Sequence, residues 1–170
     1  MGMRLAALLL LCASALPLCA ADNPVVQRLA TRWDKSGVYM IELASQMPAD
    51  GYVAKPNANE MTFGEQMLHI ASSNVFQTRG FGGGKRATFD PKRTDKESAI
   101  TALRESYEVG GAAIRALTDA ELNSKIVDTG QGEMTALEAI ILTLNHAEHH
   151  RGQAIVYLRV KGIKPTDYRF

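Results

Sequence analysis

The pattern Thr-x-x-Glu ahead of a run of spaced apolar residues constrains the fold of this chain most. It begins at Thr62, Thr94 and Thr135. In such a capping box the threonine hydroxyl accepts a hydrogen bond from the amide three residues on, and the glutamate reaches back to the capping residue. One match is weak because both residues are common, but three that each open a helical pattern indicate a mostly helical chain. We predict helices over residues 62–80, 95–118 and 135–161.

A further helix is predicted to begin at Pro24 and to end near Met47. Proline is favoured at the first helical position, and Pro48 ends the pattern. Residues 48–61 hold two prolines, a glycine and two asparagines, and they are predicted to form a loop. Gly162 stands where a left-handed residue commonly follows a helix, so the last helix should end just before it.

Four helices of this length predict a single-domain, all-α four-helix bundle without strands. The connection over residues 81–93 can span about 40 Å when extended. The helix before it is only about 28 Å long. The second and third helices can therefore lie parallel, with a long crossover between them. The segment GGGK at residues 82–85 resembles part of a phosphate-binding loop, but Arg86 replaces the serine or threonine, so a flexible crossover is favoured.

Residues 1–21 are predicted to be a signal peptide, and residues 22–170 the folded domain. A short positive start is followed by an apolar run over residues 5–18 and by small residues suited to cleavage. Leu18 before Cys19 argues against a lipoprotein, and an uncut membrane anchor is the alternative. We expect cleavage after residue 20 or 21, and a periplasmic or secreted protein.

The cysteine and charge counts restrict the classes of chemistry and partner. Cys12 and Cys19 both lie in the predicted signal peptide, so the mature protein should have neither a disulfide nor a thiol nucleophile. The whole chain has 19 Lys+Arg and 18 Asp+Glu, and removal of Arg4 makes the two counts equal. This balance argues against nucleic acid or an anionic membrane as a partner of the mature protein.

All four histidines lie in two of the predicted helices, His69 in one and His146, His149 and His150 in the other. Imidazole is the commonest protein ligand for zinc and related metals. His146 and His150 are four residues apart and project about 40° apart on a helix. If the two helices are antiparallel, His69 falls within about one turn of the same height. The spacing therefore permits a metal site formed by His69, His146 and His150.

Several alternatives to this ligand set follow from the same residues. His149 lies on the same side of the helix and is the alternative to His150, although a position at the rim suits it better. A zincin motif, His-Glu-x-x-His, is excluded because Glu148 stands one residue late. A ferritin-like di-iron site is excluded because Gln66 and Thr143 occupy the places of its glutamates. A hydrogen-bonded, metal-free patch of histidines is the alternative to any metal site.

These motifs resemble the DinB-like metalloprotein superfamily. The similarity is carried by residues 62–71 (TFGEQMLHIA), 146–153 (HAEHHRGQ) and 157–159 (YLR), and it extends over essentially all of residues 22–170. The resemblance implies an up-down-down-up four-helix bundle with the long crossover between helices 2 and 3. It also implies one divalent metal cation held by His69, His146 and His150, with water completing the coordination. We expect zinc or nickel.

Function within this family is uneven. Some members are thiol-dependent transferases or isomerases, and many have no assigned activity. A predicted export signal departs from the enzymatic relatives, whose thiol cofactors are largely cytosolic. A three-histidine ion with an open position lowers the pKa of bound water to about 7 or polarises a carbonyl. The expected function is metal-assisted hydrolysis or group (thiol) transfer on a small-molecule substrate, with no catalytic residue assigned. The alternative is a non-enzymatic metal-binding or interaction bundle, which could form a homodimer.

Two helical glycines are expected to differ in their tolerance of a side chain. Gly152 follows the histidine pair inside a predicted helix, where glycine costs about 0.5–1 kcal/mol relative to alanine. A close neighbour would explain this glycine, so we predict that Gly152→Leu disrupts packing beside the site. Gly110 lies in another predicted helix, away from the histidines, and is expected to tolerate alanine.

Overall fold

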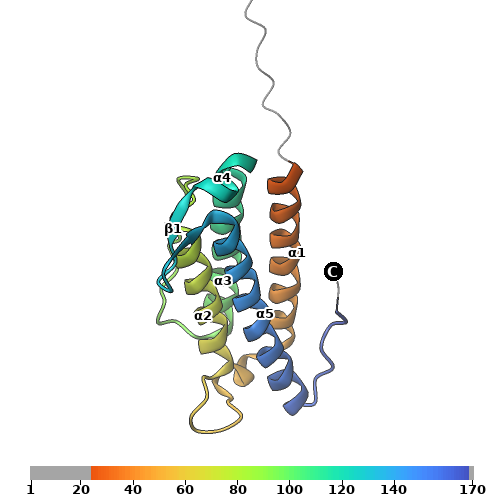
Figure 1. The fold of residues 1–170 in the computed structure, drawn as a ribbon. Coiled ribbons are helices and arrows are strands. Elements are labelled where there is room, and N and C mark those ends of the chain that lie inside the picture. The colour runs from red at the N-terminus through yellow and green to blue at the C-terminus, as the bar shows by residue number, and fades with distance from the viewer. Residues whose placement is uncertain (1–23, 169–170) are drawn as a thin grey trace, which may run out of the picture.

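The computed structural model describes residues 24–168, and these residues are mostly helical, as predicted. Its elements are α1 (Pro24–Gln46), the 3-10 helix η1 (Ala49–Val53), α2 (Phe63–Thr78), α3 (Lys96–Arg115), α4 (Asp119–Ser124), β1 (Ile126–Asp128), β2 (Glu133–Thr135) and α5 (Ala136–Val160). Figure 1 shows the long helices α1, α2, α3 and α5 side by side. The predicted signal peptide, residues 1–21, lies outside the described residues. No helix within residues 24–168 is long and apolar enough to span a membrane.

Capping boxes begin two of the long helices as predicted. The side chain of Thr62 accepts a hydrogen bond from the amide of Glu65, and the Glu65 carboxylate accepts one from the Thr62 amide at 2.6 Å. Thr135 and Glu138 form the same reciprocal pair at the start of α5. Each box satisfies backbone donors that the first turn leaves without helical partners, which explains why these two helices begin where they do.

The third predicted box is wrong, and one box was not predicted. The cap of α3 is Asp95, whose carboxylate accepts a hydrogen bond from the Ser98 amide at 3.0 Å. Aspartate is a better cap than threonine, so the helix begins one residue later than Thr94 would place it. A further box, formed by Thr118 and Glu121, opens α4. This is why the helix predicted over residues 95–118 ends at Arg115.

The prediction of a fold without strands is wrong in one detail, because β1 and β2 form a small antiparallel hairpin. Val127 is opposite Met134 in the pairing. In the turn, the carboxylate of Asp128 accepts a hydrogen bond from the Gly130 amide at 2.8 Å, and Gly130 has a φ of +80°. Strands of three residues are too short to display the alternation by which a strand is identified in a sequence.

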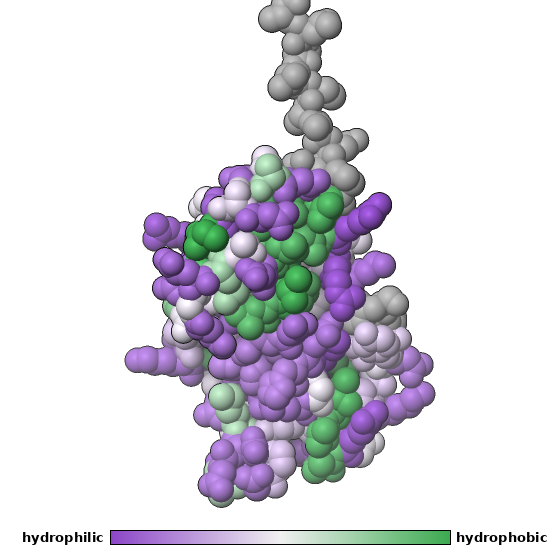
Figure 2. All heavy atoms as spheres, in the orientation of Figure 1, coloured by the Kyte–Doolittle hydropathy of each residue, from purple (hydrophilic) through white to green (hydrophobic). Residues whose placement is uncertain are grey.

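The hydrophobic core lies between the four long helices. Figure 2 shows a mainly polar surface, with apolar residues over the upper parts of α1 and α5 and over the lower end of α5. Trp33 on α1 is fully buried, and its indole N–H donates to the carbonyl of Tyr107 at 2.8 Å. The loop predicted before α2 contains η1, where the hydroxyl of Tyr52 donates to the carbonyl of Ala44. This bond fixes the connection between α1 and α2.

Close backbone approaches place the ends of α2 beside α3 and α5. A Cβ atom on Gly64 would lie 2.1 Å from the backbone oxygen of Thr94, so α2 begins against the residues that precede α3. At the other end of α2, Gly83 lies against Ala113 near the end of α3. The hydroxyl of Tyr157, near the end of α5, donates to the carbonyl of Met61 just before α2. The end of α5 therefore lies beside the start of α2.

The expectations for the two glycines are wrong. A Cβ atom on Gly110 would lie 2.3 Å from Cζ2 of Trp33, so this glycine allows α3 to approach α1. Gly152 is exposed, and a Cβ atom there would have no neighbour within 4 Å. The tightly packed glycine is the one away from the histidines.

Candidate metal centre

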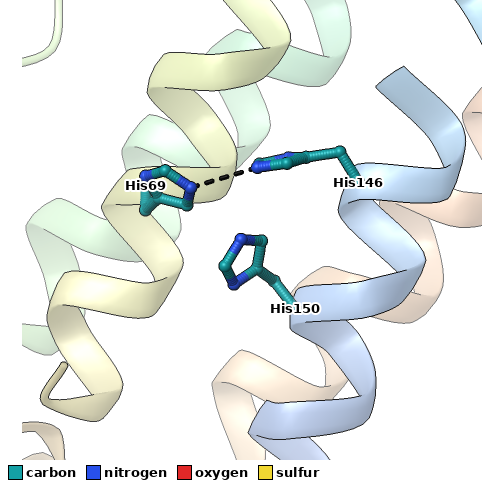
Figure 3. Close-up of side chains that lie close together, drawn as sticks. All are labelled: His69, His146 and His150. Atoms are coloured by element: carbon teal, nitrogen blue, oxygen red, sulfur yellow. Dashed lines mark hydrogen bonds between the residues drawn. The ribbon is translucent and has the colours of Figure 1, made fainter. Parts of the chain in front are cut away.

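Three histidines from two helices meet between α2 and α5, an arrangement that their spacing in the sequence permits. His69 projects from α2, and His146 and His150 project from α5 toward it (Figure 3). The Nε2 atoms of His69 and His146 are 3.0 Å apart. One ring nitrogen from each of the three residues lies within 4.8 Å of the others. The structure therefore brings together the three residues selected from the sequence.

The donor set and its geometry suit a divalent cation. Ring nitrogens lie about 2.0–2.1 Å from zinc, so two of them around a tetrahedral ion are about 3.3 Å apart. Two neutral imidazole nitrogens that face each other at 3.0 Å need a proton or a cation between their lone pairs. Within residues 24–168, these three histidines are the one group of three or more histidine, cysteine or acidic side chains that lie close enough together to hold an ion.

Burial lowers the pKa of all three imidazoles. Desolvation is the cause for His69, and it is the largest cause for His146, where His69 and His149 nearby add to it. The pKa of His150 is lowered to about 4, first by desolvation and then by His146 and His69. Because the neutral imidazole is the form that binds a metal, the site holds its ligands in the binding-competent form near neutral pH.

The ring of His150 is held by two glutamines that the sequence analysis did not identify as part of the site. Its Nδ1 atom lies 2.6 Å from Oε1 of Gln66 and 3.1 Å from Oε1 of Gln153. Amide oxygens only accept hydrogen bonds, so Nδ1 carries the proton. Gln66 stands three residues before His69 and Gln153 three residues after His150, but this spacing does not indicate that either side chain meets the ring of His150.

His149 lies outside the three-histidine group and is exposed. Its Nε2 atom is 3.0 Å from Nε2 of Gln153, and its ring centroid is 4.9 Å from that of His150. The structure thus places His149 at the rim of the site. His146 differs from His150 in the hydrogen bonding of its ring, because the Nδ1 atom of His146 is buried without a hydrogen-bond partner.

Two nearby carboxylates have other partners. Glu65 completes the capping box of α2. Glu148 accepts a hydrogen bond from Arg32 at 2.7 Å and lies 3.7 Å from Arg151. The group that could hold an ion contains no carboxylate in the described part of the chain. A surface groove of about 510 Å³ borders His69 and is also lined by Lys55.

Comparisons with known proteins show which family and which solved structures this chain is similar to. The model of the DinB superfamily matches residues 32–154. The uncharacterised protein YjoA of Bacillus subtilis (strain 168) is 28% identical over 124 residues, which cover 71% of this chain and 80% of YjoA. Among crystal structures, a DinB-like protein from Bacillus cereus ATCC 10987 has a TM-score of 0.74 at 18% identity, over 84% of this chain and 97% of that protein. The structure of YjoA has a TM-score of 0.67 at 20% identity, over 83% and 96%.

The similarity to the two crystal structures shows the fold of this chain, and the match to the family model shows its family membership. The matched segment contains α2 and the part of α5 that carries His146 and His150. It therefore includes all three histidines of the candidate centre. The chain belongs to the DinB superfamily.

Proposed function

We propose that this protein binds one divalent metal cation through His69, His146 and His150. The observation that carries the proposal is the convergence of three imidazoles, with ring nitrogens within 4.8 Å of one another, at the contact of α2 with α5. Imidazole ligands suit zinc and nickel, and we propose one of these two ions. When bound with an open coordination position, such an ion acidifies water or polarises a carbonyl.

For the reaction, we propose metal-assisted hydrolysis or group (thiol) transfer on a small-molecule substrate. The groove beside His69 supports this class of reaction. Lys55 and Glu60, which carry opposite charges, line the groove together with the proposed ligand His69. Charged side chains of both signs can orient a polar substrate there. The second candidate is a non-enzymatic metal-binding or interaction bundle. The absence of a carboxylate from the described three-histidine group favours this candidate, because a carboxylate often serves as the general base.

Metal analysis of the protein purified from its native compartment tests the proposal. We expect about one zinc or nickel ion per chain. A control sample, stripped of metal with a chelator, should again bind about one ion per chain when it is titrated with zinc or nickel at neutral pH. Purified protein that carries no stoichiometric metal and takes none up would contradict the proposed function.

Metal binding is expected to persist below the ordinary pKa of histidine. Protons compete with the ion for the imidazoles, and the pKa of each of the three is lowered from the ordinary histidine value of 6.5. Because the pKa of all three ligands lies below 6.5, the ion should be retained at pH 6.5 and released only as protons displace it at lower pH. A chromophoric chelator measures the release, and a midpoint above pH 6.5 would contradict the expectation.

The same shifts predict how the stability of the metal-free protein depends on pH. The unfolded chain takes up protons on these histidines near pH 6.5, whereas folded His150 takes one up near pH 4. Between these values the unfolded state binds more protons, so the free energy of unfolding decreases as the pH falls through this window. Thermal unfolding of metal-free protein between pH 7 and pH 4 should show this direction.

We also propose that the protein is exported to the periplasm or secreted. The apolar run over residues 5–18 and the small residues after it support cleavage near Ala21 or Asp22. Intact-mass measurement on exported protein should give a chain that begins at one of these residues. A species that retains residues 1–20, or that carries a lipid on Cys19, would show that the export proposal is wrong.

For the fold, we propose that the four long helices form an up-down-down-up bundle with the crossover between α2 and α3. The adjacent starts of α2 and α3, at Gly64 and Thr94, support a parallel pair. The bond from Tyr157 to Met61 supports an antiparallel arrangement of α5 and α2.

A further inference from the structure

A chain of side-chain hydrogen bonds runs from His150 to the surface. Nδ1 of His150 lies 2.6 Å from Oε1 of Gln66, Nε2 of Gln66 donates to Oε1 of Gln153 at 2.7 Å, and Nε2 of Gln153 lies 3.0 Å from Nε2 of His149. We propose that Gln66 and Gln153 are positioning residues, which set the ring orientation and the tautomer of His150 for the metal site.

The direction of each bond in this chain follows from the one before it. Gln66 turns its oxygen toward His150 and therefore its NH₂ group toward Gln153. Gln153 presents its oxygen to both Gln66 and His150, which leaves its own NH₂ group for His149. Since an amide oxygen cannot donate, the proton of His150 is on Nδ1 and the lone pair is on Nε2. Figure 3 shows a ring nitrogen of His150 directed toward His69 and His146.

Burial keeps the hydrogen bond between His150 and Gln66 rigid. Gln66 is 2% exposed and His150 is 8% exposed, so water does not replace the amide as a partner of Nδ1. Gln66 is on α2 and His150 is on α5, so the bond also ties together the two helices that supply the ligands. By contrast, the buried Nδ1 atom of His146 has no hydrogen-bond partner, and the ring contacts His69 through Nε2 instead. The two glutamines therefore support one ligand of the three.

A glutamine partner also has an electrostatic consequence. Histidines that bind metals commonly donate to a carboxylate or a carbonyl, and a charged partner raises the basicity of the ligand. The amide of Gln66 is neutral, so His150 remains a weaker base and a bound ion keeps more of its positive charge. Replacing the amide by a carboxylate should tighten metal binding, whereas replacing it by an apolar group should weaken binding.

Zinc titration of the full chain, against a competing chelator, tests the proposal. We expect Gln66→Leu to lower zinc affinity by about 10–100-fold and Gln66→Glu to raise it. Gln153→Leu should lower the affinity less, because Gln66 still holds Nδ1. Combined, the two leucine replacements should lower affinity by less than the product of the single effects, since both act on one network. Gln77→Leu is the matched control, because Gln77 is also a buried glutamine on α2 but takes no part in the hydrogen bonds that link His150 to His149.

A second measurement reports the tautomer directly. In metal-free wild-type protein, ¹⁵N NMR should show His150 with the proton on Nδ1 alone, and Gln66→Leu should give a mixture of tautomers. This inference rests on the proposed metal site, but the tautomer is measured without metal. A wild-type protein that binds neither zinc nor nickel would therefore overturn the metal site, while the NMR result still decides the role of the glutamines.

The proposal is overturned if folded Gln66→Leu protein keeps both the wild-type zinc affinity and the single tautomer. It is also overturned if Gln77→Leu loses as much affinity as Gln66→Leu, because the loss would then reflect general destabilisation of α2. If Gln66→Leu does not fold, Gln153→Leu decides by its zinc affinity, since Gln153 is only half-buried. A folded Gln153→Leu protein with the wild-type zinc affinity would then overturn the proposal.

Discussion

Replacing His150 by alanine should abolish stoichiometric metal binding. The three imidazoles are the whole ligand set that the described structure offers, so the replacement leaves two nitrogens, those of His69 and His146. It also leaves Oε1 of buried Gln66 without the donor that it now has. His146→Ala should have the same effect. Metal analysis of each purified variant, followed by zinc titration, measures the loss.

His149→Ala is the control for these replacements. It removes an imidazole from the same helix, but one that is exposed and stands outside the group that could hold an ion. We therefore expect at most a modest decrease in affinity, through the bond between His149 and Gln153. Equal losses from all the replacements would show that the ligand assignment is wrong.

The three proposed ligands could be selected from the sequence because their arrangement depends on local geometry. His146 and His150 share a helix face by spacing alone, and His69 needs only an antiparallel neighbour at the right height. The glutamines that hold His150 could not be selected in the same way. Gln66 is 84 residues from His150, and their contact depends on side-chain rotamers and on the rotation of α2 about its axis. Periodicity in a sequence does not carry that information.

The same contrast between local and long-range interactions explains which predictions of the fold were correct and which were wrong. The starts of α2 and α5 follow from residues within one turn, Thr62 with Glu65 and Thr135 with Glu138, so they were predicted correctly. At α3 two capping candidates are adjacent, and the carboxylate of Asp95 forms the cap. The hairpin of β1 and β2 is held by pairing between segments too short to show a pattern of their own.

Glycines show most clearly what the sequence leaves open, because the same residue serves opposite purposes in two helices. Whether a helical glycine faces a neighbour or solvent depends on how the helices pack. Gly152 lies beside the histidines, yet it faces open space. Gly110 lies away from them and touches the largest buried side chain of α1. Their effects on stability should therefore have opposite signs.

Gly110→Ala should destabilise the protein. The new methyl group would lie 2.3 Å from Cζ2 and 2.9 Å from Cε2 of Trp33, and Trp33 is rigid, fully buried and hydrogen-bonded to the carbonyl of Tyr107. Relief requires α3 to move away from α1. Overpacking of this kind costs about 1–3 kcal/mol, which for a domain of this size lowers the Tm by roughly 2–12 °C. Thermal unfolding measures the change.

Gly152→Ala is the matched control, with the opposite expected sign. Its methyl group meets no atom within 4 Å, and alanine reduces the conformational freedom of the unfolded chain. We expect a gain of about 0.5–1 kcal/mol and an unchanged metal content. A Gly110→Ala protein with the wild-type Tm would show that α3 and α1 can separate at no cost. A Gly152→Ala protein with a lower Tm or less metal would show that this face of α5 meets something that residues 24–168 do not supply.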